Sequence, residues 1–150
     1  MNNKWFVWAL VAYVVFVFVQ SLFFKFSGSA ETEIIFSTIS QWMGGITGLN
    51  IIAPFFEVWG GYTIGTIELI ASLLLLFSAT RRLGALIGLT IISGAIFFHL
   101  FTPLGINRVI NEAGDTDGGV LFYMACGVWL CCALILILAK KKRKVRSAYR

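Results

Sequence analysis

The residue of this sequence best placed to do chemistry is Glu68, a carboxylate near the middle of the apolar run 60–79. Hydrocarbon gives a charge no solvation, so acidic residues in such runs are rare and often belong to functional sites. The Glu68 carboxyl must be protonated, pair with a cation such as Lys25, or contact water. The sequence leaves these alternatives open, and each makes Glu68 the first candidate for a site.

Further polar residues are expected at a similar depth. At about 1.5 Å per helical residue, Glu68 and His99 both fall in the outer half of their runs. Gln20 and Lys25 fall in the outer part of the first apolar run. We therefore predict a polar pocket that opens toward the outer face of the membrane and is closed from outside by residues 34–56.

A carboxyl group and an imidazole suit the binding of a quinone or another lipid-soluble ligand. They can hydrogen-bond to the ligand's oxygens and exchange protons, and quinone reduction takes up two protons. The ring would contact aromatic side chains, and the candidates are Tyr13, Phe97, Phe98 and Tyr123. Each polar candidate also has a structural interpretation: helix pairing for Glu68, an interface hydrogen bond for His99, and a helix-end position for Lys25.

Metal and thiol chemistry is not indicated. Cys126, Cys131 and Cys132 lie in one apolar run, and at about 100° per residue they point in different directions, so one helix cannot gather them around a metal. The sequence has no C-x-x-C pair and only one histidine, His99. It also lacks a haem ligand pair, a flavin motif and an iron–sulfur cysteine set. We expect no metal and no intrinsic cofactor, so a redox role would use an external quinone or a partner protein.

The composition predicts an all-α integral membrane protein. The chain of 150 residues is 59% hydrophobic and 13% charged, whereas soluble domains are about 45–50% apolar and about 25% charged. Four runs approach the ~20 apolar residues that span a bilayer. We predict a single four-helix transmembrane bundle over residues 1–139, with spanning helices at about 5–24, 60–79, 83–102 and 119–139.

Residues 34–56 form a fifth apolar stretch, which Gln41, Gly44, Gly45, Asn50 and Pro54 interrupt. Its uninterrupted pieces are too short to cross a bilayer. This pattern predicts an additional interfacial or re-entrant segment between the first two spanning helices. A fifth spanning helix is the less favoured alternative.

Small and polar residues at helical spacing indicate which face of each helix packs inward. In the run 60–79 the predicted inward residues are Gly61, Gly65, Glu68, Ser72 and Ala79. In the run 83–102 they are Gly84, Gly88, Ala95 and His99. In the run 5–24 they are Ala9, Tyr13 and Gln20. In the run 119–139 they are Gly119, Tyr123, Cys126, Leu130 and Ala133.

Basic residues predict the orientation of the chain. Lys4, the pair Arg81 and Arg82, and the tail 140–150 fall on one side of a four-span chain, and most acidic residues fall on the other. The positive-inside rule places both termini in the cytoplasm. The basic cytoplasmic tail 140–150 is expected to attract anionic lipid head groups. We expect no nucleic acid partner.

The stretch 65–86, Gly-Thr-Ile-Glu-Leu-Ile-Ala-Ser-Leu-Leu-Leu-Leu-Phe-Ser-Ala-Thr-Arg-Arg-Leu-Gly-Ala-Leu, resembles the core signature of DoxX-like membrane proteins. Further similarities are the His99-Leu100 ending of the third run, Asp117-Gly118-Gly119 before the last, and Phe-x-Lys25 closing the first. The resemblance covers most of the chain and is weakest over 26–57. It implies a four-helix fold in a prokaryotic inner membrane and an accessory subunit of a respiratory or redox assembly.

Three functions are consistent with the sequence, and it does not decide whether any reaction is catalysed. The first is a redox accessory subunit that binds a quinone or similar ligand around Glu68. The second is a non-catalytic scaffold or assembly factor that recruits other membrane or redox proteins, or a second copy of itself. The third is a small proton-coupled transporter, which ranks last because the two halves show no inverted repeat.

Overall fold

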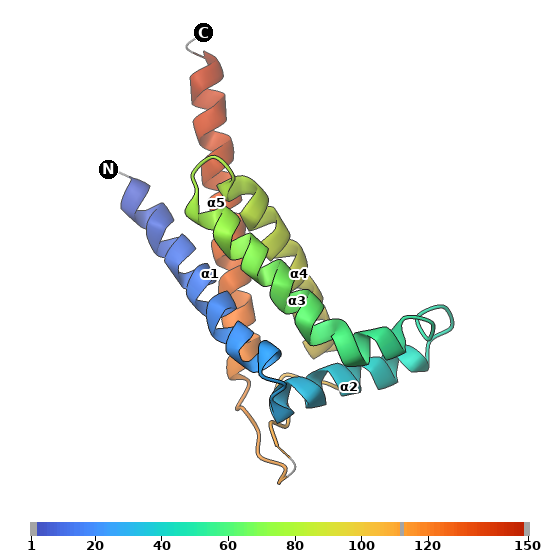
Figure 1. Ribbon diagram of the computed structural model, residues 1–150. Helices are drawn as coiled ribbons and strands as arrows, with labels where there is room; N and C mark the ends of the chain where they lie inside the picture. The colour runs from blue at the N-terminus through green and yellow to red at the C-terminus, as the bar shows by residue number, and fades with distance from the viewer. Residues whose placement is uncertain (1–2, 112, 149–150) are drawn as a thin grey trace.

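The computed structural model describes residues 3–111 and 113–148, without the side chains of Asn3 and of residues 140–148. Within these residues every regular element is an α-helix, so the all-α prediction is confirmed. Four helices run alongside one another as a bundle, and a shorter one lies across one end (Figure 1). The helices are α1 (Asn3–Phe26), α2 (Ala30–Gly44), α3 (Ala53–Leu76), α4 (Arg81–Phe101) and α5 (Val120–Ala148).

Among the described residues, α1, α3, α4 and α5 each contain a segment long and apolar enough to cross a membrane. Their outward surfaces are apolar as well: Trp5, Phe16, Phe23, Leu73 and Ile137 are all exposed. Apolar surface of this extent is stable only in an apolar solvent. The chain is therefore a multi-pass membrane protein, as predicted.

Two helix boundaries differ most from those predicted. Helix α3 begins at Ala53 rather than near residue 60, with Pro54 in its first turn. Proline is tolerated there because its missing N–H would have no helical partner. Helix α5 continues to Ala148 rather than ending near 139. Side chains of the tail 140–150 lie outside the described residues, so its attraction for anionic lipid stays a prediction.

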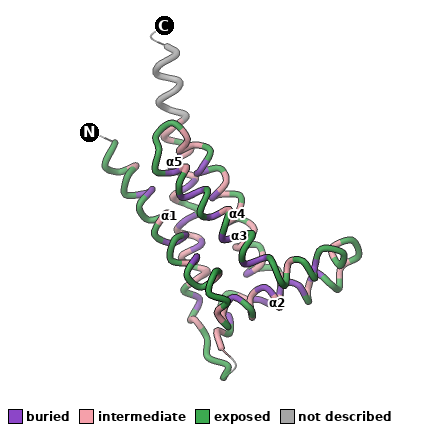
Figure 2. Tube along the Cα trace, in the orientation of Figure 1, coloured by how far each residue is buried: buried purple, intermediate pink, exposed green. Residues whose placement is uncertain are grey.

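The interrupted stretch 34–56 is divided between α2, a turn over 45–52, and the start of α3. Ser29 caps α2, because its hydroxyl accepts a hydrogen bond from the Thr32 N–H at 3.3 Å. Helix α2 has 15 residues, too few to span a bilayer. Its buried residues pack along the first half of α3 (Figure 2). Whether it lies at the membrane interface stays a prediction.

The predicted inward faces of α3 and α4 are largely confirmed. On α3, Gly61, Gly65, Glu68 and Ser72 are buried, whereas Ala79 lies beyond the helix end and is exposed. Gly84, Gly88 and His99 are buried on α4, and Ala95 is half-buried. A Cβ atom on Gly84 would lie 2.8 Å from both Ala71 O and Leu75 N of α3. Small residues thus let the backbones of α3 and α4 approach closely.

The predicted inward faces of α1 and α5 are wrong in part: Gly119 is buried, and Cys126 and Ala133 are half-buried, as expected for inward residues. Ala9, Tyr13, Gln20, Tyr123 and Leu130 are exposed. The buried residues of these helices are apolar instead: Leu10, Val11, Val14, Val17, Phe18 and Leu22 on α1, and Ala125, Val128, Cys132 and Ile135 on α5. In lipid the outward surface is apolar as well, so the few polar residues of a helix do not by themselves mark its inward face.

Candidate functional site

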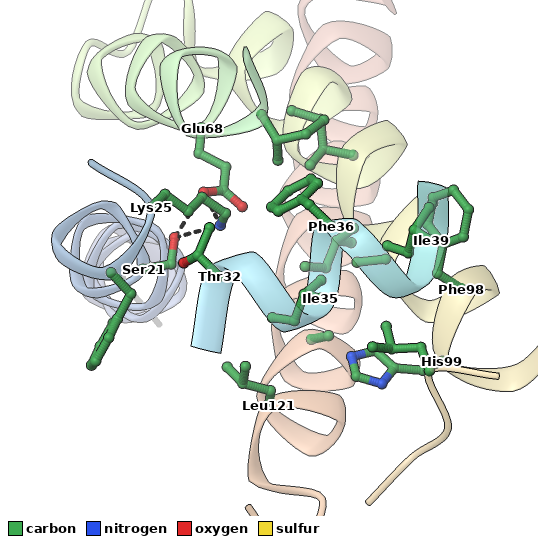
Figure 3. Close-up of a pocket in the computed structure, with 18 of the residues that line it drawn as sticks. Ser21, Lys25, Thr32, Ile35, Phe36, Ile39, Glu68, Phe98, His99 and Leu121 are labelled. Carbon is green, nitrogen blue, oxygen red and sulfur yellow. Dashed lines mark hydrogen bonds and ion pairs between the residues drawn. The ribbon is translucent and has the colours of Figure 1, made fainter. Parts of the chain in front are cut away.

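A cavity of about 640 Å³ lies at the end of the bundle that α2 covers, with residues of all five described helices in its wall. This volume is within the range of small-molecule pockets, about 300–1,000 Å³. Helix α2 supplies one wall through Ile35, Phe36 and Ile39, opposite side chains of α3, α4 and α5 (Figure 3). Most lining residues are apolar, so the polar ones define where a ligand could be oriented.

Glu68 is held on one side of the cavity by two residues of α1. Lys25 Nζ lies 2.7 Å from Glu68 Oε2, and Ser21 Oγ lies 2.7 Å from the same oxygen (Figure 3). Lys25 also donates to Ser21 Oγ at 3.0 Å. The Glu68 and Lys25 side chains are only 6% and 16% exposed. Of the alternatives for Glu68, the ion pair with Lys25 is the one observed, and Ser21 is a partner that sequence reasoning missed.

The local sequence explains how this pair forms inside an apolar bundle. Ser21 and Lys25 are four residues apart, so they lie on the same face of α1. Gly65, one turn before Glu68 on α3, leaves room for Leu22 and Phe26 of α1. Buried charges are tolerated when they are paired and hydrogen-bonded. An ammonium group has three N–H donors, and Lys25 uses two of them on Ser21 and Glu68.

His99 lines a different side of the cavity. Its Nδ1 lies 2.6 Å from the carbonyl oxygen of Gly105. A carbonyl can only accept a hydrogen bond, so Nδ1 carries the proton, and Nε2 of the neutral ring is an acceptor. Figure 3 shows Ile35 and Phe36 between Glu68 and His99. Proton transfer between these two residues would therefore need a bridging molecule.

Arg108 is a cavity-lining cation that sequence reasoning did not single out. It lies between α4 and α5, yet its side chain is 1% exposed. Its Nη2 pairs with Glu31 in the first turn of α2, and its Nε lies 3.4 Å from Asp117 Oδ2. The signal that could have revealed it is a single arginine in an otherwise acidic loop.

Asp117 also fixes the start of α5. Its carboxylate accepts hydrogen bonds from the backbone N–H groups of Gly119 at 2.9 Å and Leu121 at 3.3 Å. A carboxylate in this position satisfies free amides and complements the helix dipole. The Asp117 N–H donates in turn to the Arg108 carbonyl at 3.2 Å. Arg108 is thus tied to α2 by Glu31 and to α5 by Asp117.

The remaining predicted site residues divide into two groups. Gln20 lines the cavity although it is largely exposed, and Phe98 lines it as well. Tyr13, Tyr123 and Phe97 are exposed and do not line it. The structure therefore gathers Glu68, Lys25, His99 and Gln20 around one cavity and leaves the two predicted tyrosines outside. The aromatic lining is contributed by Phe18, Phe24, Phe36, Phe56 and Phe98.

In the part of the chain that the structure describes, no group of three or more His, Cys, Asp or Glu residues could hold a metal ion. Cys126, Cys131 and Cys132 are free thiols, of which Cys132 is buried in the bundle core. Comparison of the chain with protein-family models, with curated proteins and with solved structures gives no match. The functional interpretation therefore rests on the cavity and its polar groups.

Proposed function

We propose that this protein binds a quinone or a similar lipid-soluble ligand in the cavity around Glu68, as an accessory subunit of a membrane redox or respiratory assembly. One observation carries the proposal: an apolar cavity inside a membrane bundle has hydrogen-bonding groups on separate sides. The Lys25–Glu68–Ser21 group lies on one side and His99 on another. A molecule with an apolar ring and oxygens at its edges matches this distribution of groups.

The protonation chemistry of the lining residues suits both forms of such a ligand. The third N–H of Lys25 can donate to a quinone carbonyl oxygen. The reduced quinol carries hydroxyl groups, which can donate to Glu68 or to Nε2 of His99. The ring would lie against Phe36 and Phe98 of the cavity wall. Electrons would come from a partner protein.

The proposed orientation has α2 on the outer side of a prokaryotic inner membrane and both termini in the cytoplasm. The charge distribution supports it, because Lys4, Arg81 and Arg82 lie at the end of the bundle opposite α2 (Figure 1). Glu31 and Glu33 lie in the first turn of α2. Basic residues are enriched on the cytoplasmic side of membrane proteins. The resemblance to DoxX-like proteins supports the same arrangement and the accessory role.

The proposal is tested by native mass spectrometry and lipid extraction on protein purified in mild detergent. Wild type is compared with Glu68→Gln and with the matched control Glu33→Gln. Glu33 is exposed on α2 and lies outside the cavity wall. We expect a quinone to co-purify with wild type and with Glu33→Gln, and to be lost from Glu68→Gln. Wild type that carries only phospholipid, with Glu68→Gln equally stable, contradicts the proposal and favours the scaffold function.

A further inference from the structure

The Arg108 guanidinium has hydrogen-bonding capacity that the protein does not use. A guanidinium carries five N–H donors in a fixed plane. The Nη1 and Nε atoms of Arg108 are buried and have no hydrogen-bond partner among the described residues. Buried donors without a partner are unfavourable, and native proteins usually satisfy them with protein, water or a ligand. Arg108 lines the cavity and its Nε faces Asp117 at 3.4 Å, so Nη1 is the donor left for a molecule bound there.

The charges around the cavity decide which chemical group fits that donor. The lining contains two cations, Lys25 and Arg108, and three carboxylates, Glu31, Glu68 and Asp117. Lys25 is paired with Glu68, while Arg108 already faces both Glu31 and Asp117. The surroundings of Arg108 therefore carry excess negative charge. An anionic group would be repelled by those carboxylates at close range, whereas a neutral oxygen would gain the hydrogen bond without that repulsion.

We propose that Arg108 binds a neutral carbonyl or ester oxygen of a lipid-soluble ligand through Nη1, and that Glu31 and Asp117 exclude anionic lipids. This inference rests on the proposed function and deepens it, because it assigns the head-group chemistry that the same cavity selects. The apolar walls accept the hydrocarbon part. The hydrogen bonds that the Asp117 carboxylate accepts from the start of α5, and its ion pair with Arg108, hold the guanidinium in place.

The test uses two probes that share one hydrocarbon chain. Methyl oleate has a neutral ester head, and oleate at pH 8 has an anionic head. Binding of each to the full-length protein is measured in a neutral detergent by native mass spectrometry with competition against a short-chain benzoquinone. We expect wild type to bind methyl oleate about tenfold or more tightly than oleate. Equal or tighter binding of oleate overturns the inference.

The variant Glu31→Gln tests directly whether Glu31 excludes anionic lipids from the cavity. Its side chain is 24% exposed, so the amide is tolerated, and the variant removes one of the two carboxylates beside Arg108. Oleate binding should tighten about tenfold, while methyl oleate binding should stay within about twofold. Glu33→Gln makes the same charge change in the same helical turn, away from the cavity, and should leave both affinities unchanged. Unchanged selectivity in Glu31→Gln overturns the inference.

A second variant, Arg108→Lys, keeps the positive charge and removes the planar donor fork. Methyl oleate binding should weaken about tenfold. If it is unchanged in a folded variant, an ordered water satisfies Nη1 and the inference fails. If Arg108→Lys does not fold, the inference is decided by the selectivity of Glu31→Gln between methyl oleate and oleate. Failure of these probe tests, with a quinone still lost from Glu68→Gln, leaves the proposed function standing. Absence of binding by quinone and by both probes overturns the two together.

Discussion

The two ends of the bundle are packed in opposite ways. At the turn between α3 and α4, Gly84 lies against the backbone of Ala71 and Leu75, and no side chain separates the helices. At the other end, Gly60 and Gly61 lie against side chains of α2, chiefly the ring of Phe36. The first end is a closed contact between backbones, and the second is bounded by movable side chains beside a cavity. Small residues at helical spacing therefore produce rigid packing or an adaptable wall, depending on whether backbone or side chain faces them.

Buried charged and polar side chains are also concentrated at one end of the bundle. The main core cluster of the bundle is apolar, with Val11, Leu75 and Cys132 fully buried. At the α2 end the buried side chains include Glu68, His99 and Arg108. Buried polar groups cost stability relative to an apolar core of the same volume, so their concentration at one end points to a role other than packing.

The largest effect is expected from Lys25→Met, which removes the cation from the pair. Glu68 would remain buried without its partner, and breaking such a pair costs about 3–5 kcal/mol. Thermal unfolding in detergent measures the loss. The double variant Lys25→Met with Glu68→Leu should recover most of it, because no charge is left uncompensated.

Lys4→Met is the matched control for this prediction, because Lys4 is exposed at the opposite end of α1. Its unfolding temperature should match that of wild type. If the single and double Lys25 variants were equally destabilised, Lys25 would not stabilise the protein through its ion pair with Glu68. The buried charges at the α2 end would then not explain the loss of stability.

The next effect separates a glycine packed against backbone from a glycine of the cavity wall that faces open space. At Gly84 an added methyl would meet backbone atoms of α3 that cannot move aside, so Gly84→Ala should destabilise the bundle by about 1–3 kcal/mol. Gly94→Ala on the same helix is the control, since a Cβ there meets nothing within 4 Å. It should be neutral or stabilising by up to about 1 kcal/mol, because alanine favours helix over glycine. Equal effects at the two glycines would contradict close packing at the α3–α4 turn.

A smaller effect is expected for Gly60→Ala at the α2 end. The added methyl would meet the ring of Phe36, a side chain that can rotate away. The loss of stability should therefore stay below about 1 kcal/mol, at the low end for an overpacked site. The ring would turn into the cavity, so quinone binding should weaken. A loss as large as that of Gly84→Ala would show that the α2 end is equally rigid.

The sequence was sufficient for the parts of this fold that depend on composition and on charge. Apolar run length located the four spans, and the cost of a buried carboxylate made the Lys25–Glu68 pair one of the few alternatives. It was insufficient where burial depends on the neighbouring helix. The buried faces of α1 and α5 are apolar like their lipid-facing sides, so Tyr13 and Tyr123, which do not line the cavity, were wrongly predicted as site residues. Arg108 was missed because only the folded loop brings it beneath α2.

The smallest effect is expected from Tyr123→Leu, which tests that distinction between cavity and outer surface. Tyr123 is 67% exposed and lies outside the cavity wall, whereas Phe98 lines it. Removing the Tyr123 ring should change stability by no more than about 0.5 kcal/mol and leave quinone affinity unaltered. Phe98→Leu removes a ring of similar size from the wall, and should weaken quinone binding about tenfold, a change of about 1.4 kcal/mol. Weaker binding in Tyr123→Leu would mean that the ligand contacts the outer surface of α5, and equal binding in both variants would place it away from the α2 end altogether.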